Sequence, residues 1–386
     1  MLSGFEFATP ARIIFGSGAA RQIGTLATAW GKQALVVTGR STARVEPILA
    51  SLRAAHVACE VFRIPGEPTM SVVRDGVERA KAWQTDLVIG FGGGSALDGA
   101  KAISALLTNP GDLLDYLEVV GLGKPLTKTA APCIAIPTTA GTGTEVTRNA
   151  VLASPEHQVK ASLRSLLMLP RIALVDPELT RGLPREITAT TGLDALTQLI
   201  EPYVCLRANP LTDALCMEGM SRVARSLQRA WLDGQDMAAR EDMAVASLFG
   251  GFALANAGLG AVHGFAAPIG GMFPAPHGAV CAALLPHVMG ANLVALRSRM
   301  PSSPALPRYD TVAGILTGHP GARAEDGVLW VRHLCHALSV PSLGTYGITP
   351  DAFPILAEKA AQASSMKANP VVLSPAEMGQ ILLKSL

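Results

Sequence analysis

Three side chains in the second half of the sequence are of the types that bind a divalent metal ion. Asp194, His263 and His277 supply one carboxylate and two imidazoles, and each lies in an apolar stretch. Burying a carboxylate without a partner is costly, whereas a divalent cation compensates its charge and takes neutral imidazoles as further ligands. Gln198 follows Asp194 by four residues, on the same face of a helix, and offers a weak neutral oxygen. These residues predict a metal site; the alternative is that each histidine is a hydrogen-bonded core residue.

This ligand set predicts a catalytic centre. One carboxylate and two histidines leave a coordination position open, as catalytic rather than structural metal sites do. We expect the metal to act there as a Lewis acid while hydride passes to or from a nicotinamide. The stretch from Met243 to Leu296 holds both histidines and contains no Asp, Glu, Lys or Arg. An apolar pocket follows, which favours a small, uncharged alcohol or aldehyde as substrate.

A glycine-rich segment in the first half has the pattern of a dinucleotide site. The segment 87–101 is an apolar strand pattern, then three glycines, then a helical pattern. Glycines allow backbone amides to approach a diphosphate, and a helix N-terminus adds N–H donors and the positive end of its dipole. An N-cap and N3 pair would also explain the serine and the aspartate of this segment. The residues predicted to bind the cofactor here are Gly92, Gly93, Gly94, Ser95 and Asp98.

A second polar loop, Pro137–Thr147, follows the next strand pattern at its carboxyl end. Ligands bind at that end of the strands in open α/β sheets. Small hydroxyls and glycines bond phosphate and ribose without crowding them, although a threonine-rich turn is the plain alternative. The residues predicted to bind the cofactor here are Thr138, Thr139, Thr142 and Thr147.

The end of the first strand bears on the choice between NAD and NADP. A carboxylate at this place would bond the ribose 2′-hydroxyl of NAD and repel the 2′-phosphate of NADP. The chain instead has Gly39, Arg40 and Ser41, which we include in the cofactor site. Arg40 and Ser41 favour NADP, and a solvated loop arginine is the alternative interpretation.

The elements that must position these residues fall into two predicted domains. Alternating β-branched runs and helical patterns predict a mostly parallel α/β dinucleotide-binding domain over residues 1–183, with helices on both faces of the sheet. Residues 184–386 show helical patterns broken by Gly and Pro, which predicts an all-α metal and substrate domain. Phe5–Phe7 and Arg12–Phe15 predict an edge hairpin or a strand shared with a partner. The strands expected in the sheet are Ala34–Thr38, Glu60–Arg63, Leu87–Phe91, Cys133–Ile136 and Ile172–Val175, and the helices are Ala43–Ala55, Ser71–Trp83 and Ser95–Thr108.

The composition excludes several classes of protein. The 386 residues are 49% hydrophobic and 16% charged, and the net charge of +2 is spread without basic clusters, which argues against nucleic-acid binding. The sequence has no uninterrupted apolar stretch of about 20 residues, so it predicts no membrane span. The beginning of the chain lacks a secretory pattern, so we expect a cytoplasmic protein. Low charge with high apolar content predicts a homodimer. The six cysteines form no CxxC pair and are interpreted as reduced thiols without a role.

Together these motifs resemble the iron-containing (group III) alcohol dehydrogenase family over nearly the whole chain. The resemblance implies an N-terminal nucleotide-binding domain, a C-terminal helical domain, NAD(P), a metal and frequent dimers. It also implies that Asn149 and Lys160 lie near the nicotinamide and substrate, with Lys160 a catalytic residue, and that Leu179 contacts the cofactor. The motifs that carry it are Gly92–Ser95 with Asp98 and Lys101, Pro137–Thr147, Val175–Leu179, Thr191–Leu196, Gly258–His263, Pro276–Gly278 and Leu284–Met289.

Two positions depart from the family pattern. The usual histidine four residues after the aspartate is Gln198, and a frequent histidine four residues after His263 is Ala267. The remaining Asp194, His263 and His277 resemble the ligand set of the zinc-using glycerol dehydrogenase branch, so we predict Zn²⁺ or Fe²⁺. The residue at 267 also removes a proposed proton-relay group, which leaves water or a ribose hydroxyl to carry protons.

Three rival functions stay open at this point. A metal-independent reductase resembling maleylacetate reductase is favoured by the loss at Gln198, while retention of Asp194 favours metal. A metalloenzyme resembling dehydroquinate synthase would need basic phosphate ligands, which are absent around the two histidines. A degenerate member that binds nucleotide and serves as a scaffold is the third.

Overall fold

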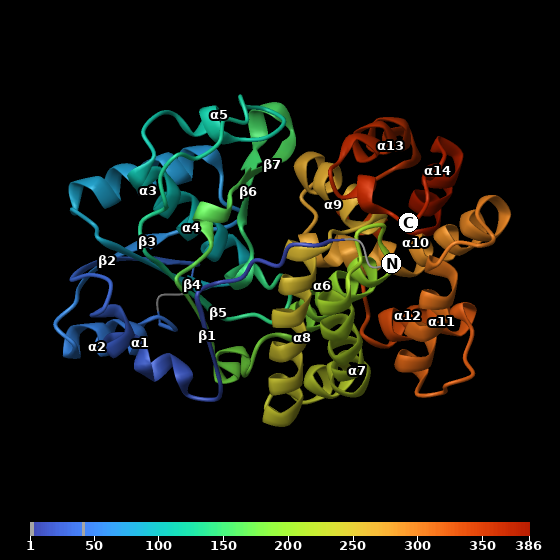
Figure 1. Cartoon of the computed structure of the whole chain (residues 1–386), viewed down its shortest axis with the longest axis horizontal. Coiled ribbons are helices and arrows are strands. Elements are labelled where there is room, and N and C mark those ends of the chain that lie inside the picture. The colour runs from blue at the N-terminus through green and yellow to red at the C-terminus, as the bar shows by residue number, and fades with distance from the viewer. Residues whose placement is uncertain (1–3, 41–42) are drawn as a thin grey trace. The chain divides into compact units, whose positions relative to one another are not determined.

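The computed structural model describes residues 4–40 and 43–386, and this part of the chain divides into two compact units. The α/β unit comprises Ala8–Thr139 and Gly143–Arg181. The helical unit comprises Gly182–Leu386, Ala140–Thr142 and the described N-terminal residues through Phe7. In Figure 1 the strands are blue to green and the helices of the helical unit run from light green to red.

A parallel sheet forms the centre of the α/β unit. Among the described residues its order is β1-β8-β5-β4-β2-β3, and every neighbouring pair is parallel. The chain leaves β2 toward β3 on one side and returns to β4 on the other, so a topological switch point lies between β2 and β4, where such sheets bind ligands. The strands are β1 Arg12–Phe15, β2 Gln33–Thr38, β3 Ala58–Arg63, β4 Leu87–Gly92, β5 Cys133–Pro137 and β8 Ile172–Val175.

Helices cover both faces of this sheet, as expected for strands that are apolar along their whole length. On β2, Ala34 and Val36 pack in the hydrophobic cluster of α1 and α2. Leu35 and Val37 alternate to the opposite face and pack in the cluster of α3 and α4. Figure 1 shows the two pairs of helices on opposite sides of the strands. The helices of this unit are α1 Ile23–Ala27, α2 Glu46–Ala54, α3 Met70–Ala82, α4 Gly94–Thr108 and α5 Leu113–Tyr116.

Two details of the sheet differ from the sequence expectation. Arg12–Phe15 is a parallel edge strand that pairs with β8 of its own chain, and Gly4–Phe7 is not a strand, so the predicted edge hairpin is wrong. An antiparallel hairpin was missed instead, β6 Asn149–Ser154 with β7 Val159–Arg164. Its turn places Gln158 in the left-handed region (φ 50°) rather than a glycine, so the usual hairpin turn signal is absent.

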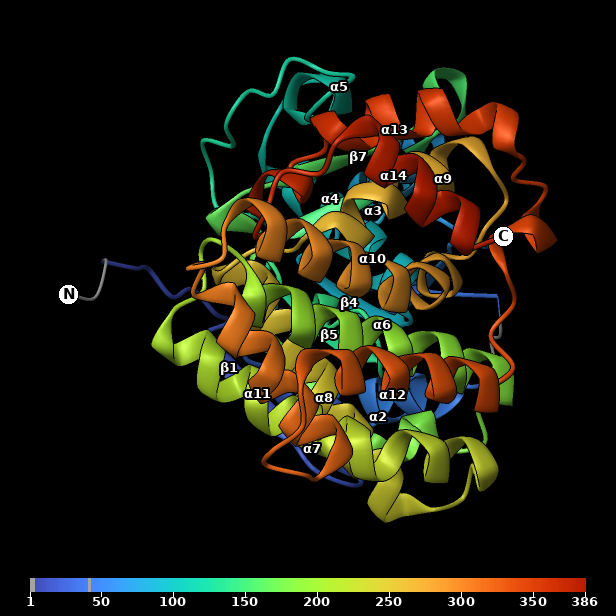
Figure 2. The same ribbon diagram turned by 90° about the vertical axis from the view of Figure 1, so that its right-hand side faces the viewer.

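The helical unit is built around α6. Most of its side chains are buried on all sides, which identifies it as a central core helix. It packs against α7, α8 and α10, and Figure 2 shows it among them. The helices are α6 Arg185–Val204, α7 Pro210–Leu232, α8 Met237–Asn256, α9 Ala261–Met272, α10 His277–Arg299, α11 Ala305–Thr317, α12 Ala324–Ala337, α13 Phe353–Gln362 and α14 Pro375–Lys384.

Short 3₁₀ turns connect several of these elements. They are η1 Ala19–Gln22, η2 Thr144–Val146, η3 Pro155–His157, η4 Leu166–Met168, η5 Pro177–Thr180, η6 Leu343–Tyr346, η7 Pro350–Ala352 and η8 Met366–Ala368.

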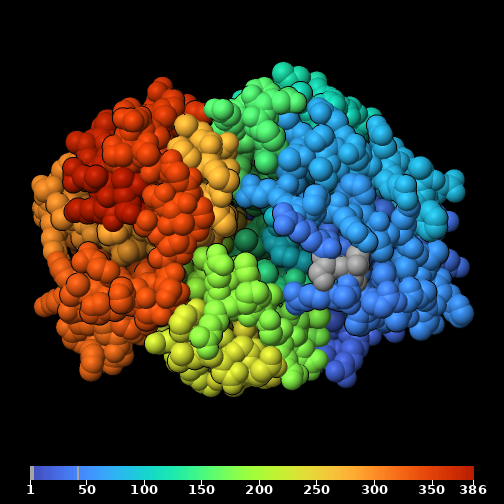
Figure 3. Space-filling model, turned by 180° about the vertical axis from the view of Figure 1, so that it is seen from behind, coloured from blue at the N-terminus to red at the C-terminus, as the bar shows by residue number. Residues whose placement is uncertain are grey.

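Helix α10 is long and apolar enough to cross a membrane, in contrast to the expectation from the sequence, where Pro286 and His287 shortened the apolar run. Most of its apolar window is buried, however, against α6, α9, α12 and α14. Figure 3 shows the orange to red C-terminal part of the chain on the surface of the helical unit. The burial is that of a core helix.

Candidate active site

The three residues predicted to bind metal meet in the helical unit. Asp194 comes from α6, His263 from α9, and His277 is the first residue of α10. Nε2 of His263 lies 3.5 Å from Oδ1 of Asp194, and Nε2 of His277 lies 3.7 Å from the same oxygen. With Sγ of Cys281, these ligand atoms all lie within 4.8 Å of one another. Three distant segments thus bring one carboxylate, two imidazoles and a thiol to one point.

One oxygen of the Asp194 carboxylate is buried without a hydrogen bond in the described part of the chain. Asp194 is 1% exposed, and its Oδ1 has no hydrogen-bond partner among the described residues. Burial raises the pKa of Asp194, but His277 and His263 outweigh it and hold the pKa below its usual value. A buried carboxylate oxygen without a hydrogen bond is costly, and a cation between it and the imidazoles would remove that cost. The donor set therefore fits a divalent metal.

Glu201 fixes the orientation of His263. Its Oε2 lies 2.7 Å from Nδ1 of His263, and its Oε1 accepts a hydrogen bond from the backbone N–H of Val262 at 2.7 Å. Nδ1 bonded to a carboxylate leaves Nε2 as the nitrogen that faces Asp194, the arrangement found around metal-binding histidines. Sequence analysis missed Glu201, although it follows Asp194 by seven residues and therefore lies on the same face of α6.

Cys281 is the second residue that sequence analysis missed. Its Sγ lies 3.7 Å from Nε2 of His277 and 3.9 Å from Nε2 of His263. It follows His277 by four residues on α10, so helical spacing was the available signal. Burial raises the pKa of this thiol to about 12. The cysteine belongs to the same cluster as the predicted ligands.

Gln198 lies on the same helix but is partly engaged elsewhere. It is 1% exposed, and its Nε2 donates a hydrogen bond to the carbonyl of Gly141 at 3.1 Å. Its Oε1 is buried without a hydrogen-bond partner in the described part of the chain. Its role as a ligand stays a prediction.

Three predicted cofactor loops meet at the carboxyl edge of the sheet in the α/β unit. The N–H of Thr138 donates to the carbonyl of Gly92 at 2.9 Å. A Cβ on Gly93 would lie 3.5 Å from Thr139, and one on Gly92 would lie 3.7 Å from the backbone nitrogen of Gly39. Gly92 has a φ of 156° and would also bring a Cβ within 2.7 Å of Cβ of Ala96, so a side chain is excluded there.

The helix after these glycines begins before Ser95, so Ser95 is not its N-cap residue. Helix α4 starts at Gly94 with Gly93 as its N-cap, so Ser95 is inside the first turn. The capping interpretation of Ser95 and Asp98 is therefore wrong. The free N-terminus of α4 lies at the topological switch point, which is where a diphosphate is expected.

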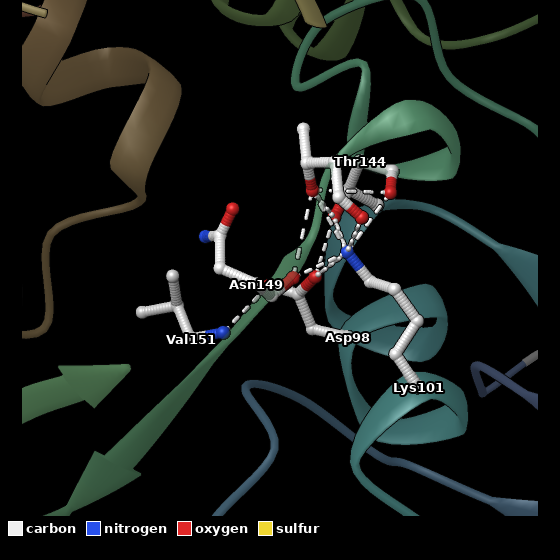
Figure 4. Close-up of polar contacts among 6 residues, drawn as sticks. Asp98, Lys101, Thr144, Asn149 and Val151 are labelled. Carbon is white, nitrogen blue, oxygen red and sulfur yellow. Dashed lines mark hydrogen bonds and ion pairs between the residues drawn. The ribbon is translucent and has the colours of Figure 1, made fainter. Parts of the chain in front are cut away.

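A fully buried lysine ties the second polar loop to α4 (Figure 4). Nζ of Lys101 donates to the carbonyl of Thr144 at 2.9 Å, to Oγ1 of Thr144 at 2.8 Å and to Oγ1 of Thr147 at 2.9 Å. It also donates to the carbonyl of Asn149. The side-chain amide of Asn149 points away from this cluster in Figure 4.

Asp98 balances the charge of this lysine. Its Oδ1 lies 3.2 Å from Nζ of Lys101 and accepts from Oγ1 of Thr144, and its Oδ2 accepts from the N–H of Val151 at 3.0 Å. Burial lowers the pKa of Lys101, and Asp98 opposes that shift. Asp98 and Thr147 thus hold α4, the loop and β6 together. Their predicted contacts with the cofactor stay predictions.

The remaining predicted residues are placed as follows. The guanidinium of Arg40 is exposed and donates to the carbonyl of Pro65, and Ser41 lies outside the described residues. Thr142 is half-buried in the segment grouped with the helical unit. Leu179 lies in η5 and packs beside the core. The roles of these residues in binding the cofactor stay predictions.

Lys160, the predicted catalytic lysine, lies on β7 and forms an ion pair with Glu67. The side chain of Lys160 is 6% exposed and that of Glu67 is 40% exposed. Its catalytic role stays a prediction.

Two family profiles match the sequence. The one described as iron-containing alcohol dehydrogenase covers residues 10–177, and the one described as the C-terminal part of the Fe-containing alcohol dehydrogenase family covers residues 188–386. The chain belongs to the iron-containing alcohol dehydrogenase family. As a member it is an oxidoreductase that acts on alcohols with NAD(P) and a divalent metal.

Full-length relatives agree with this family. The chain is 36% identical over 374 residues to 1,3-propanediol dehydrogenase of Klebsiella pneumoniae, covering 95% of each chain. It is 34% identical over 387 residues to NAD-dependent methanol dehydrogenase of Bacillus methanolicus, covering 99% of this chain and 100% of that one. A crystal structure of 1,3-propanediol oxidoreductase matches with a TM-score of 0.90 at 34% identity and covers 100% of both chains. The α/β plus all-α fold class is therefore confirmed, and the scaffold and dehydroquinate-synthase-like interpretations have no support among these matches.

Proposed function

We propose that Asp194, His263 and His277 hold the divalent cation of this alcohol dehydrogenase. The observation that carries the proposal is the buried Oδ1 of Asp194, which has no hydrogen bond in the described part of the chain and lies 3.5 and 3.7 Å from the Nε2 atoms of the two histidines. When bound, the cation supplies Lewis-acid polarisation of the alcohol or carbonyl oxygen while hydride is exchanged with NAD(P).

The other residues of the site position these groups. Glu201 keeps Nε2 of His263 facing Asp194, because it accepts from Nδ1. The loops after β2, β4 and β5, with the N-terminus of α4, bind the dinucleotide through Gly92, Gly93 and Thr138. Lys160 contacts the substrate or nicotinamide in this proposal, and Lys160→Met is expected to lower kcat.

We further propose a small, uncharged alcohol or aldehyde as substrate. The apolar sequence around His263 and His277 disfavours charged substrates, and the relatives named above are a 1,3-propanediol and a methanol dehydrogenase. Turnover on a panel of C2 to C8 alcohols, diols, aldehydes and hydroxy acids tests this. A preference for hydroxy acids over the neutral compounds would overturn the proposal.

For the cofactor we propose a preference for NADP over NAD. The segment after β2 has Arg40 and no carboxylate, so nothing in its sequence repels a 2′-phosphate. One relative is named NAD-dependent, which makes the comparison informative. The ratio of kcat/KM for the two cofactors tests the preference, and a ratio that strongly favours NAD would reject it.

Metal dependence separates this proposal from the metal-independent, maleylacetate-reductase-like alternative, which the loss of a histidine at Gln198 favours. Elemental analysis for Fe and Zn, with turnover before and after chelation, distinguishes the two. Activity that vanishes on chelation and returns with metal supports the proposal, whereas full turnover by metal-free protein supports the alternative.

A further inference from the structure

The metal cluster contains one group more than the proposed ligands. Sγ of Cys281 lies 3.7 Å from Nε2 of His277 and 3.9 Å from Nε2 of His263, and it belongs to the same set of four ligand atoms within 4.8 Å. The side chain is fully buried, so solvent is not its partner. A thiol that faces two imidazoles and a carboxylate at these distances has an orientation suited to a shared cation.

The distances fit tetrahedral coordination. Bonds of about 2.0–2.2 Å to nitrogen and oxygen and about 2.3 Å to sulfur, at tetrahedral angles, separate neighbouring ligand atoms by roughly 3.3–3.8 Å. The two distances from Asp194 Oδ1 to the histidines are 3.5 and 3.7 Å, and those from Cys281 Sγ are 3.7 and 3.9 Å. Four of the six separations among these atoms thus lie close to the tetrahedral range, and the other two are within 4.8 Å.

We propose that Cys281 is a fourth protein ligand of the metal, so that Asp194, His263, His277 and Cys281 form a centre that takes Zn²⁺ in preference to Fe²⁺. The substrate oxygen would then take a fifth position, since catalytic zinc sites can expand to five ligands. This inference rests on the proposed metal site. On binding, the Cys281 S–H bond breaks, its proton passes to solvent, and the sulfur donates an electron pair to the cation; no oxidation or reduction occurs. The thiolate and the Asp194 carboxylate then balance the two charges of the cation in a buried setting.

The chain itself favours Cys281 over Gln198 in this role. The amide oxygen of Gln198 is buried without a hydrogen-bond partner in the described part of the chain, but it is a neutral and weak ligand. A thiolate is anionic and soft, and soft sulfur ligands favour Zn²⁺ over Fe²⁺ in a mononuclear site of this kind. The chain thus has no histidine at 198 and offers an anionic sulfur ligand at 281.

The test is a spectrum of the full chain refilled with Co²⁺ after removal of its metal. A thiolate bound to Co²⁺ gives an intense charge-transfer band in the near ultraviolet, which nitrogen and oxygen ligands do not. We expect this band in the wild type, in Gln198→Ala and in Cys335→Ser, and its loss in Cys281→Ser. Cys335 is the matched control, since its thiol lies in the same unit and bonds the carbonyl of Ala282 on α10.

Zn²⁺ affinity, measured by competition with a coloured chelator, gives a second readout. We expect Cys281→Ser to weaken Zn²⁺ binding by on the order of 100-fold or more, since loss of a residue that only supports a ligand already costs about 10- to 100-fold, and to reduce the preference for Zn²⁺ over Fe²⁺. Cys335→Ser should bind as the wild type does.

The possible outcomes distinguish the role of Cys281 from the proposed three-ligand metal site. Co²⁺ bound by the wild type without the charge-transfer band overturns the role of Cys281 and leaves the three-ligand site intact. A wild-type chain that binds neither Co²⁺ nor Zn²⁺ overturns both. The wild-type spectrum decides the question even if Cys281→Ser does not fold.

Discussion

At the scale of single residues, the site depends on side chains whose partners lie far away in sequence. Asp194, His263 and His277 were predictable, because their types and apolar surroundings are visible in the sequence. Glu201 and Cys281 were not singled out, although each shares a helical face with a predicted ligand. A buried carboxylate or thiol is ordinary in a core, and only the meeting of α6, α9 and α10 gives these two a chemical role.

Glu201→Gln tests the positioning of His263. Glutamine has one acceptor oxygen where Glu201 uses two, for Nδ1 of His263 and for the N–H of Val262. We expect metal affinity to fall about 10- to 100-fold, as for other residues that support metal-binding histidines. Titration with Zn²⁺ measures it, and Glu201→Ala should be weaker still. Unchanged affinity in both variants would contradict the positioning role.

Glu145 predicts a pH dependence of stability. It is 2% exposed in η2, and burial raises its pKa from 4.5 to about 7. Because the native state holds this proton more tightly than the unfolded state, the stabilisation is complete below about pH 4.5 and is lost as the pH rises through about 7. Between pH 5 and pH 8 the free energy of unfolding should fall more in the wild type than in Glu145→Gln, by roughly 3 kcal/mol. Denaturant unfolding at the two pH values measures this difference.

Glu156→Gln, in an exposed turn nearby, is the control for this measurement and should follow the wild type. Equal losses in Glu145→Gln and the wild type would show that Glu145 is not the group responsible.

At the scale of elements, the strands were the most predictable part of the fold. Fully buried runs such as Leu87–Gly92 are apolar throughout, so their sequence differs clearly from loops. The β6–β7 hairpin was missed because its turn residues are Pro155 to Gln158, without the Asn-Gly type of signal. The start of α4 was missed by one residue, which sufficed to make the capping interpretation of Ser95 wrong.

The tie between α4 and the loop after β5 predicts a large effect of Lys101→Met. This change removes a fully buried cation and leaves Asp98 without its charged partner. Breaking a buried pair in this way costs about 3–5 kcal/mol. Denaturant unfolding measures the loss, and Asp98→Asn combined with Lys101→Met should recover part of it. A single variant as stable as the wild type would show that the pair does not hold the loop.

The N-terminus of α9 predicts that Gly260→Ala disturbs the metal site. Gly260 is the N-cap residue of α9 and has no side chain to bond the first N–H groups of the helix. Glu201 accepts from the N–H of Val262 instead, and Asn369 accepts from the N–H of Ala261. A Cβ at Gly260 would lie 2.8 Å from Oε1 of Glu201 and 3.0 Å from Oδ1 of Asn369. We expect lower stability and weaker metal binding, measured by thermal unfolding with and without Zn²⁺.

Gly379→Ala is the matched control. It is inside α14 with open space around the new Cβ, so alanine should be neutral or stabilise by up to about 1 kcal/mol. If Gly260→Ala behaved in the same way, the close packing at α9 would have no energetic role.

At the scale of the whole molecule, the fold class was predictable from sequence because the two halves differ in periodicity. The homodimer and the cytoplasmic location stay predictions. The outer edge of β1 pairs with no further strand of the described chain, which leaves the predicted sharing of this strand with a partner open.

The proposed metal site is tested most directly by the metal content of the purified wild-type chain, compared with that of Asp194→Asn. Asparagine keeps the size of the side chain but removes the charge that the cation compensates. We expect about one divalent ion per wild-type chain, its loss in Asp194→Asn, and turnover that follows metal content. Full alcohol turnover by wild-type protein without metal would contradict this expectation.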